Sequence, residues 1–285
     1  MIEGGAISEQ HYASKWGQFR LAHSEVGAEP PADYQERLDE YLAKVTDINQ
    51  SDLAAYVSRR RVILDVLAKL IRANEHGKFY REDEIHKLLI PMRTDSNEIG
   101  TDASNLWIID ERLAFHDYLA SDKTLKSIPI TGSESTKEPD VIATRLAGDP
   151  VLASQGESLP LPAIVVVEVK RPLRNDASED RDPIQQCLDY VRRVREGGVR
   201  TFAGRPIPQS QDVPAFCYVV ADLTPTMISR CKYAGLRPTH DHLAYFGFNE
   251  GFKAYIEVTS FERLVDAASE RNRAFFDKLG FPASR

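Results

Sequence analysis

The chain has 285 residues, of which 42% are hydrophobic and 28% charged, values typical of a soluble α/β or α+β protein with one large or two small domains. Its net charge of −7 argues against a protein that coats nucleic acid nonspecifically, because that mode needs many contacts between basic side chains and phosphates. It has no apolar run near the ~20 residues that span a bilayer, no signal-peptide pattern, and three cysteines without CxxC spacing. We therefore expect a cytoplasmic protein without membrane contact, disulfide framework or zinc site.

The N-terminal region is polar and contains a Pro30-Pro31 break, followed by an amphipathic helical segment at 34–45. We expect residues 1–55 to form a helical arm or linker and residues 56–285 to form the main domain. At the start of that domain, apolar residues recur at helical spacing over 59–73 and 82–90, where Pro91 ends the helix. Residues 105–110 indicate a strand and 111–119 an amphipathic continuation.

The second half alternates expected strands with expected helices. A Ser/Thr/Gly/Pro loop at 127–137 precedes a strand entry at 139–143, and a surface excursion rich in Gly, Pro and Ser covers 145–161. Strands are expected at 163–169 and 215–221, helices at 183–196, 225–234 and 261–279, and a hairpin at 242–248 and 252–258. This order predicts an α/β fold.

The segment Ile164-Val-Val-Val-Glu-Val-Lys170 is the most informative of the chain. Its apolar β-branched residues indicate a buried strand, and residues two apart on a strand point to the same face. Glu168 and Lys170 therefore emerge side by side at the end of a core strand. Because buried charges are costly unless they bind something, they form either a functional site or a buried ion pair.

Asp140 follows Pro139 at the start of the preceding expected strand, and Gln186 and Tyr190 are one turn apart on the following helix. If the two strands pair, Asp140 and Glu168 can converge, and two close carboxylates favour a divalent cation between them. Ligands that are all oxygens suit Mg²⁺ or Mn²⁺ rather than zinc. Lys170 could then orient a water or stabilise charge on a phosphate.

Pro139-Asp140, Glu168-Val-Lys170 and Gln186-x-x-x-Tyr190 together resemble the motifs of the PD-(D/E)xK nuclease superfamily, in its form with a glutamine-tyrosine helix. The resemblance covers roughly residues 80–260. It implies a restriction-endonuclease-like mixed central sheet of about four strands flanked by helices. It also implies Mg²⁺-dependent cleavage of DNA, less often of RNA.

Carried over by position, the resemblance makes Asp140 and Glu168 metal ligands, adds the Val169 carbonyl as a third oxygen, and makes Lys170 the catalytic lysine. Gln186 would support the site or the phosphate. Many members also have an acid on the helix before the first strand, for which Glu84 is the first candidate and Glu111 the second.

Residues 105–116 and 118–123 are similar to segments of nuclease-type domains attached to ATPase modules in bacterial anti-phage and restriction-like proteins. This similarity implies an ATPase or sensor partner module, because the chain itself has no GxxxxGK[ST] loop. Many such enzymes act as dimers, so we also expect a homo-oligomer. The span from Lys170 to Arg205 holds nine Lys/Arg and six Asp/Glu, a local charge of +3 beside the expected site.

Two alternatives from other functional classes stay open. The chain could be a catalytically silent nucleic-acid-binding or sensor module that keeps the nuclease fold, or a scaffold that multimerises through its N-terminal arm. Individual residues also have plain interpretations: Asp140 as a turn residue, Tyr190 as core packing with a satisfied hydroxyl, and Arg192, Arg193 and Arg195 as a solvated helix end.

Overall fold

The computed structural model describes residues 34–100, 103–114, 116, 118–145, 163–178, 181–200, 204–206 and 210–280. Contacts between residues divide the chain into two units, Met1–Tyr56 and Val57–Arg285. The second unit contains the sheet and the candidate site, and it is described by itself. Residues 1–33 of the expected arm and nearly all of the expected surface excursion at 145–161 lie outside the described residues.

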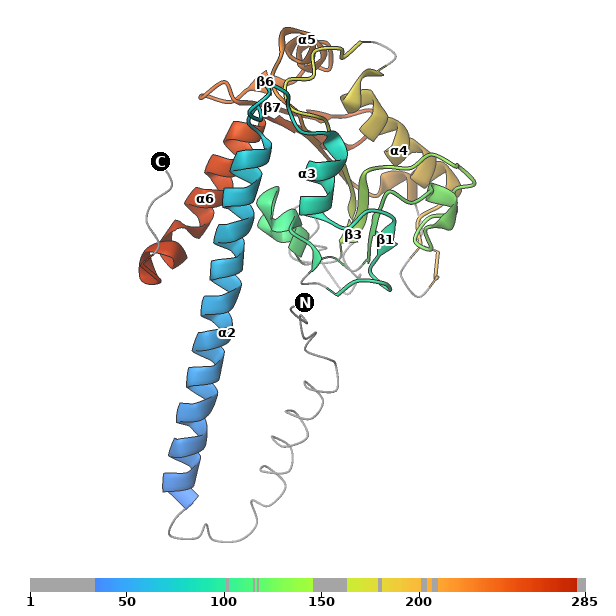
Figure 1. The fold of residues 1–285 in the computed structure, drawn as a ribbon. Helices are drawn as coiled ribbons and strands as arrows, with labels where there is room; N and C mark the ends of the chain where they lie inside the picture. Colours follow the sequence, from blue (N-terminus) through green and yellow to red (C-terminus); the bar gives the residue numbers. More distant parts are fainter. Residues whose placement is uncertain are drawn as a thin grey trace. The chain divides into compact units, whose positions relative to one another are not determined.

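A mixed eight-stranded sheet forms the centre of the second unit, in the order β1-β2-β3-β4-β5-β8-β7-β6 (Figure 1). Neighbouring strands are antiparallel, except that β5 is parallel to both β4 and β8. This sheet and its flanking helices confirm an α/β fold with a mixed sheet. The strands are β1 (Thr94–Asp95), β2 (Tyr118–Ser121), β3 (Val141–Arg145), β4 (Ala163–Val169), β5 (Ala215–Val220), β6 (Arg237–Pro238), β7 (Ala244–Asn249) and β8 (Ala254–Thr259).

Local sequence signals explain where the helices begin. Asp182 accepts hydrogen bonds from the Ile184 and Gln185 amides at the start of α4, where Pro183 supplies a fixed helical φ. The Ser260 hydroxyl accepts from the Arg263 amide at the start of α6. The helices are α2 (Tyr34–Leu70), α3 (Glu82–Leu89), α4 (Pro183–Gly197), α5 (Pro225–Tyr233) and α6 (Phe261–Lys278), with short 3₁₀ turns η2 (Leu106–Ile108), η3 (Glu111–Ala114), η4 (Leu125–Ser127) and η7 (Ser210–Asp212).

Strand β4 is buried on both faces, which explains its continuous apolar run. Ile164 and Val166 belong to an apolar cluster that also contains residues of α4 and α5. Val165 and Val167 belong to a second cluster, built with residues of α2, α3 and α6. Because successive strand residues alternate between faces, Glu168 follows Val166 on the α4 side of the sheet.

Most expected elements are confirmed, and two segments that were expected as separate helices form one helix. The two helical segments expected at 34–45 and 59–73 belong to the single helix α2, which ends at Leu70. The residues between them contain neither Gly nor Pro, so nothing in the local sequence interrupts the helix. The strands at 163–169 and 215–221, the helix at 183–196, the hairpin and the terminal helix are found within one or two residues of the expected bounds.

The strand expected at 105–110 is wrong: Leu106–Ile108 form the 3₁₀ turn η2, with all three side chains buried. A short apolar run cannot distinguish a buried strand from a buried helical turn. The Arg271 guanidinium donates hydrogen bonds to the carbonyls of Trp107 and Ile108, which ties this turn to α6. The amphipathic segment expected at 111–119 is also not continuous. It is divided between the turn η3 and strand β2, which lies next to the edge strand β1.

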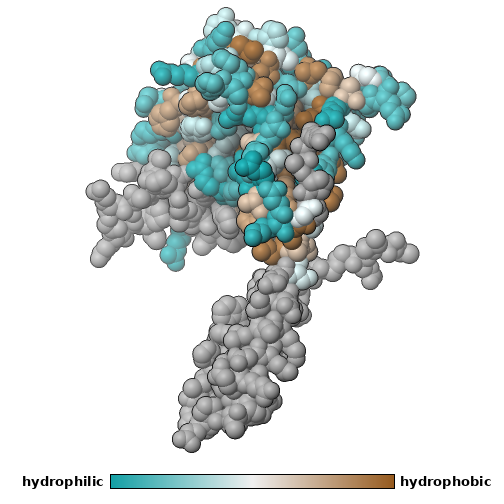
Figure 2. Space-filling model, turned by 90° about the vertical axis from the view of Figure 1, so that its left-hand side faces the viewer, coloured by the Kyte–Doolittle hydropathy of each residue, from teal (hydrophilic) through white to brown (hydrophobic). Residues whose placement is uncertain are grey.

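The surface carries apolar side chains among polar ones rather than one dominant apolar area on the face drawn in Figure 2. Val62 and Val66 of α2 and Phe275 of α6 are among the exposed apolar residues. Within the described ranges, no helix combines the length and the apolar character that crossing a membrane requires. Cys187, Cys217 and Cys231 are free and buried.

Two glycines bring the loop before β3 against the end of α4. The Gly132 amide donates to the Gly198 carbonyl at 2.9 Å, and a Cβ on Gly132 would lie 2.0 Å from the Gly197 oxygen. We expect Gly132→Ala to lower the free energy of unfolding by about 1–3 kcal/mol, because the two backbones would have to separate. Gly100→Ala, where an added Cβ meets no atom within 4 Å, serves as the control. Equal urea midpoints for the two variants would contradict this packing.

Candidate active site

The pairing of β3 with β4 brings the two predicted acids together. Val141 is paired with Val167 in this antiparallel ladder, so the same register places Asp140 opposite Glu168. Residues directly opposite each other share a face, with Cβ atoms about 4.5–5.5 Å apart. The Asp140 carboxylate also accepts a hydrogen bond of 2.7 Å from the Val169 amide, which fixes it against the end of β4. The sequence-based expectation that these residues converge is therefore met in the geometry.

Glu168 and Lys170 form a buried ion pair at the end of β4. The Lys170 Nζ donates to Glu168 Oε2 at 2.6 Å, and the two residues are only 7% and 3% exposed. The Lys170 amide donates to the Val220 carbonyl, so the backbone continues alongside β5 and holds the lysine in place. A pair this buried requires strong local compensation, because removing two charges from water is costly.

The site combines close acids with one buried cation, and this shifts the pKa values of both Glu168 and Lys170. Burial, followed by repulsion from the Asp140 carboxylate, raises the pKa of Glu168 to about 7. Burial lowers the pKa of Lys170, but attraction to Glu168 and its acidic neighbours is stronger, and the net effect raises the pKa of this ammonium. Lys170 is therefore charged at neutral pH, and it compensates only part of the negative charge around it.

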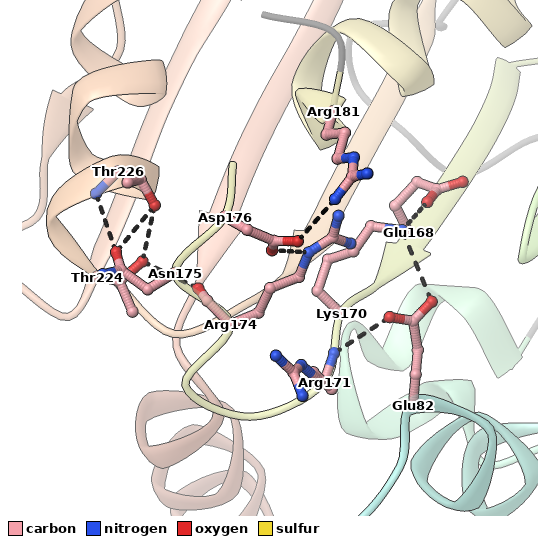
Figure 3. Close-up of polar contacts among 10 residues, drawn as sticks. All are labelled: Glu82, Glu168, Lys170, Arg171, Arg174, Asn175, Asp176, Arg181, Thr224 and Thr226. Atoms are coloured by element: carbon pink, nitrogen blue, oxygen red, sulfur yellow. Dashed lines mark hydrogen bonds and ion pairs between the residues drawn. The ribbon is translucent and has the colours of Figure 1, made fainter. Parts of the chain in front are cut away.

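The upstream acid that reaches the site is Glu82, not Glu84. Glu82 Oε1 lies 3.8 Å from Lys170 Nζ, and its other oxygen accepts from the Arg171 amide at 3.2 Å (Figure 3). The Glu84 carboxylate is exposed and accepts from the Arg81 amide, so it caps its own helix. The second candidate, Glu111, is held by both terminal nitrogens of the Arg60 guanidinium.

Helix α3 positions Glu82 through a contact one turn further along. His86, which is 2% exposed, makes a hydrogen bond of 2.8 Å between its Nε2 and the hydroxyl of Ser121 at the end of β2. This contact ties α3 to the sheet beside β3. The sequence does not single out Glu82, because the run Glu82-Asp83-Glu84 offers three acids and only the docking of α3 determines which one faces the sheet.

Helix α4 contributes Gln186 and Tyr190. The Tyr190 hydroxyl donates to the Glu138 carbonyl at 2.9 Å, which ties α4 to the segment that carries Pro139 and Asp140. The Gln186 Oε1 atom is buried and has no hydrogen-bond partner among the described residues. A buried amide oxygen without a protein partner is unusual, and it leaves this acceptor available within the site.

The donor set fits Mg²⁺ or Mn²⁺ but is small. Asp140 and Glu168 repel each other, and the Val169 backbone adjoins both, so two carboxylates and a carbonyl are available as oxygen ligands. Mg²⁺ is commonly held by one or two carboxylates, with water and phosphate oxygens completing its shell. In the part of the chain that the structure describes, no cluster of three or more His, Cys, Asp or Glu side chains forms a metal site.

The basic residues after β4 divide into two groups. Arg192 pairs with Glu196 on α4, and Arg195 is buried and donates to the carbonyls of Val213 and Phe252, so this run has a structural role. Three other basic side chains instead follow Lys170 in the loop toward α4 and at the helix start, namely Arg171, Arg174 and Arg181 (Figure 3). From the sequence, only the net charge of the longer span from Lys170 to Arg205 pointed to these arginines.

No family model, curated protein or solved structure matches this chain. The resemblance to PD-(D/E)xK nucleases therefore rests on its motif residues and on the geometry described above.

Proposed function

We propose that this protein is a Mg²⁺- or Mn²⁺-dependent nuclease that hydrolyses phosphodiester bonds in DNA. The observation that carries the proposal is the buried Glu168, with Asp140 opposite it and Lys170 Nζ 2.6 Å from its carboxylate. A central strand that ends in such a pair has a cost in stability, and perturbed, buried titratable groups gather at functional sites. A structural ion pair between Lys170 and Glu168 does not require a second carboxylate, that of Asp140, beside it.

In this proposal Asp140, Glu168 and the Val169 carbonyl hold the metal ion. A bound Mg²⁺ supplies Lewis acidity toward a phosphoryl oxygen and lowers the pKa of water. Lys170, charged and fixed beside Glu168, orients the attacking water or stabilises the negative charge that develops on the phosphate. The unsatisfied Gln186 Oε1 accepts a hydrogen bond from that water or from a substrate group.

The proposal also includes a restriction-endonuclease-like fold for the domain that carries the site. The elements α3, β2, β3, β4, α4 and β5 surround the site, and the motif residues lie at corresponding ends of β3 and β4. This arrangement supports a restriction-endonuclease-like domain. The sheet has eight strands where the resemblance implies about four, so β1, β6, β7 and β8 are additions to that core.

Incubation of the purified protein with plasmid and linear DNA, with Mg²⁺, Mn²⁺ or EDTA, tests the proposal. We expect cleavage only with a metal ion, and Asp140→Asn to reduce it at least about 100-fold by removing a ligand charge while keeping the side-chain shape. Glu84→Gln should cleave like the natural protein, since a glutamine can also cap the helix. Cleavage that survives Asp140→Asn would remove this residue from the metal site.

One observation favours the silent binding module as the second candidate. Lys170 contacts Glu168 directly, and an ion pair this close can satisfy both charges without a ligand. That alternative predicts DNA binding without cleavage under any metal condition. It also predicts that Mg²⁺ leaves the thermal midpoint of the protein unchanged, whereas a metal that binds the folded state raises it.

A further inference from the structure

Two arginines near the candidate site converge on one carboxylate of the protein, that of Asp176. Arg174 Nε donates to Asp176 Oδ1 at 2.5 Å, and Arg181 donates to Asp176 Oδ2 at 3.3 Å (Figure 3). Arg174 comes from the loop after β4, and Arg181 lies two residues before the start of α4. Each guanidinium thus contributes a nitrogen to a different oxygen of the same acid, which is the arrangement that a phosphate group also accepts.

This pair of arginines borders the proposed catalytic lysine. Lys170, Arg174 and Arg181 line one small pocket, together with Ala177, Pro183, Ala221 and Met227. Parts of three basic side chains therefore lie around one small concavity, with the Lys170 ammonium itself turned to Glu168.

The backbone around Arg174 is held in place by the segment that follows β5. The Leu173 amide donates to Asp222, the Thr224 hydroxyl donates to the Arg174 carbonyl, and the Asn175 side chain accepts from Thr226. Only 22% of the Arg174 side chain is exposed, whereas Asp176 and Arg181 are 46% and 65% exposed. The anchored arginine is thus fixed, and the acid that it binds is accessible to solvent.

We propose that Arg174 and Arg181 form a clamp for a backbone phosphate of DNA, and that Asp176 occupies this clamp in the free protein. The inference rests on the proposed function, because it assumes that the adjacent site receives a phosphodiester. Ion pairs at exposed positions contribute little, so exchange of the carboxylate for a phosphate is energetically accessible. A phosphate also forms charge-assisted, paired hydrogen bonds with guanidinium groups.

Fluorescence anisotropy of a labelled DNA duplex in EDTA tests the clamp, because binding is then measured without cleavage. Asp176→Asn removes the competing charge and should tighten binding about fivefold. Arg181→Ala should weaken binding and reduce the slope of log K against log salt by about 0.9, the value for one lost phosphate contact. Loss of folded protein is expected to lower specific binding rather than raise it, so Asp176→Asn, checked for its fold by circular dichroism, is the decisive variant.

The exposed ion pair between Arg192 and Glu196 on α4 provides matched controls, since the two residues lie 2.9 Å apart and outside the pocket. Arg192→Ala and Glu196→Gln should change DNA affinity less than twofold. Equal affinities for Asp176→Asn and the natural protein would overturn the clamp. An increase in DNA affinity for Glu196→Gln as large as that for Asp176→Asn would also overturn the clamp. The same holds if Asp176→Asn changes the affinity for RNA and not the affinity for DNA.

The clamp and the nuclease proposal can fail separately. Tighter binding by Asp176→Asn without cleavage by any variant in Mg²⁺ or Mn²⁺ supports the clamp and contradicts the nuclease. Metal-dependent cleavage with unchanged binding and salt dependence in Asp176→Asn and Arg181→Ala supports the nuclease and contradicts the clamp.

Discussion

Replacing Lys170 with methionine is expected to reduce metal-dependent DNA cleavage by about 10²- to 10⁴-fold, the range found when a positioned acid–base group or a charge-stabilising donor is removed. Methionine keeps much of the length and the apolar stem of lysine and removes only the ammonium. That ammonium lies 2.6 Å from Glu168 and 3.8 Å from Glu82. Single-turnover cleavage of a labelled duplex at saturating Mg²⁺ measures the effect on the chemical step.

The same substitution has a second effect, on stability. Removing one partner of a buried ion pair leaves the other charge uncompensated, which typically costs about 3–5 kcal/mol. The double variant Lys170→Met with Glu168→Gln removes both charges and should regain much of this stability without regaining cleavage. Rates must therefore be compared for the folded fraction, determined by circular dichroism.

Arg195→Met provides a matched control for the loss of a buried cation. Arg195 is 6% exposed and donates to two backbone carbonyls, those of Val213 and Phe252, in a different part of the molecule from Glu168. It should destabilise the protein and leave cleavage per folded molecule unchanged. If Lys170→Met behaves in the same way, Lys170 is a structural residue.

The affinity for Mg²⁺ or Mn²⁺ is expected to depend steeply on pH below about 7. Burial and the nearby Asp140 carboxylate raise the pKa of Glu168 to about 7, and a carboxylate must lose its proton before it can bind a metal ion. Below that pH the apparent association constant should fall about tenfold per pH unit, and above it the constant should level off. Isothermal titration calorimetry with Mn²⁺ between pH 5.5 and 8.5 measures this profile.

Asp140→Asn separates the two causes of the raised Glu168 pKa, which are burial and repulsion from the Asp140 carboxylate. Without the charge of Asp140, the pKa of Glu168 should fall, so the inflection moves to lower pH while the affinity at pH 8 decreases. The pH dependence of the free energy of unfolding, measured without metal, reports the Glu168 pKa independently. Because Glu168 holds its proton more tightly when folded, its contribution to the free energy of unfolding falls as the pH rises from about 4.5 to about 7. An affinity that stays constant from pH 5.5 to 8 would contradict the role of Glu168 as a ligand.

The elements predicted well are those whose signals are local. Strand β4, helix α4 and the hairpin of β7 and β8 carry periodic apolar residues, a capping Asp182 or a turn at Gly251, and each was found near its expected bounds. The elements predicted poorly are short, and most of them depend on distant partners. Residues 106–108 form a turn held by Arg271, and β2 and β6 have only four and two residues. The turn and β2 are held by segments far away in the sequence, whereas β6 pairs with β7, the next strand of the chain.

The candidate site also combines features that follow from local sequence with features that depend on long-range contacts. The two-residue spacing of Glu168 and Lys170 on a strand already required their side chains to share a face. The β3–β4 register, which sets Asp140 opposite Glu168, depends on pairing across more than 20 residues. The choice of Glu82 over Glu84 depends on how α3 docks, which His86 and Ser121 fix from outside the acidic run.

By itself, then, the sequence determined that a core strand ends in an acid and a base on one face, because that geometry follows from the backbone alone. Tertiary structure decided which further groups surround them: Asp140 by strand register, Glu82 by helix docking, and Asp176 by the two arginines that converge on it. The physical reason is that side-chain direction along a strand is a local property. Contacts between elements instead depend on long-range packing, which one stretch of sequence does not encode.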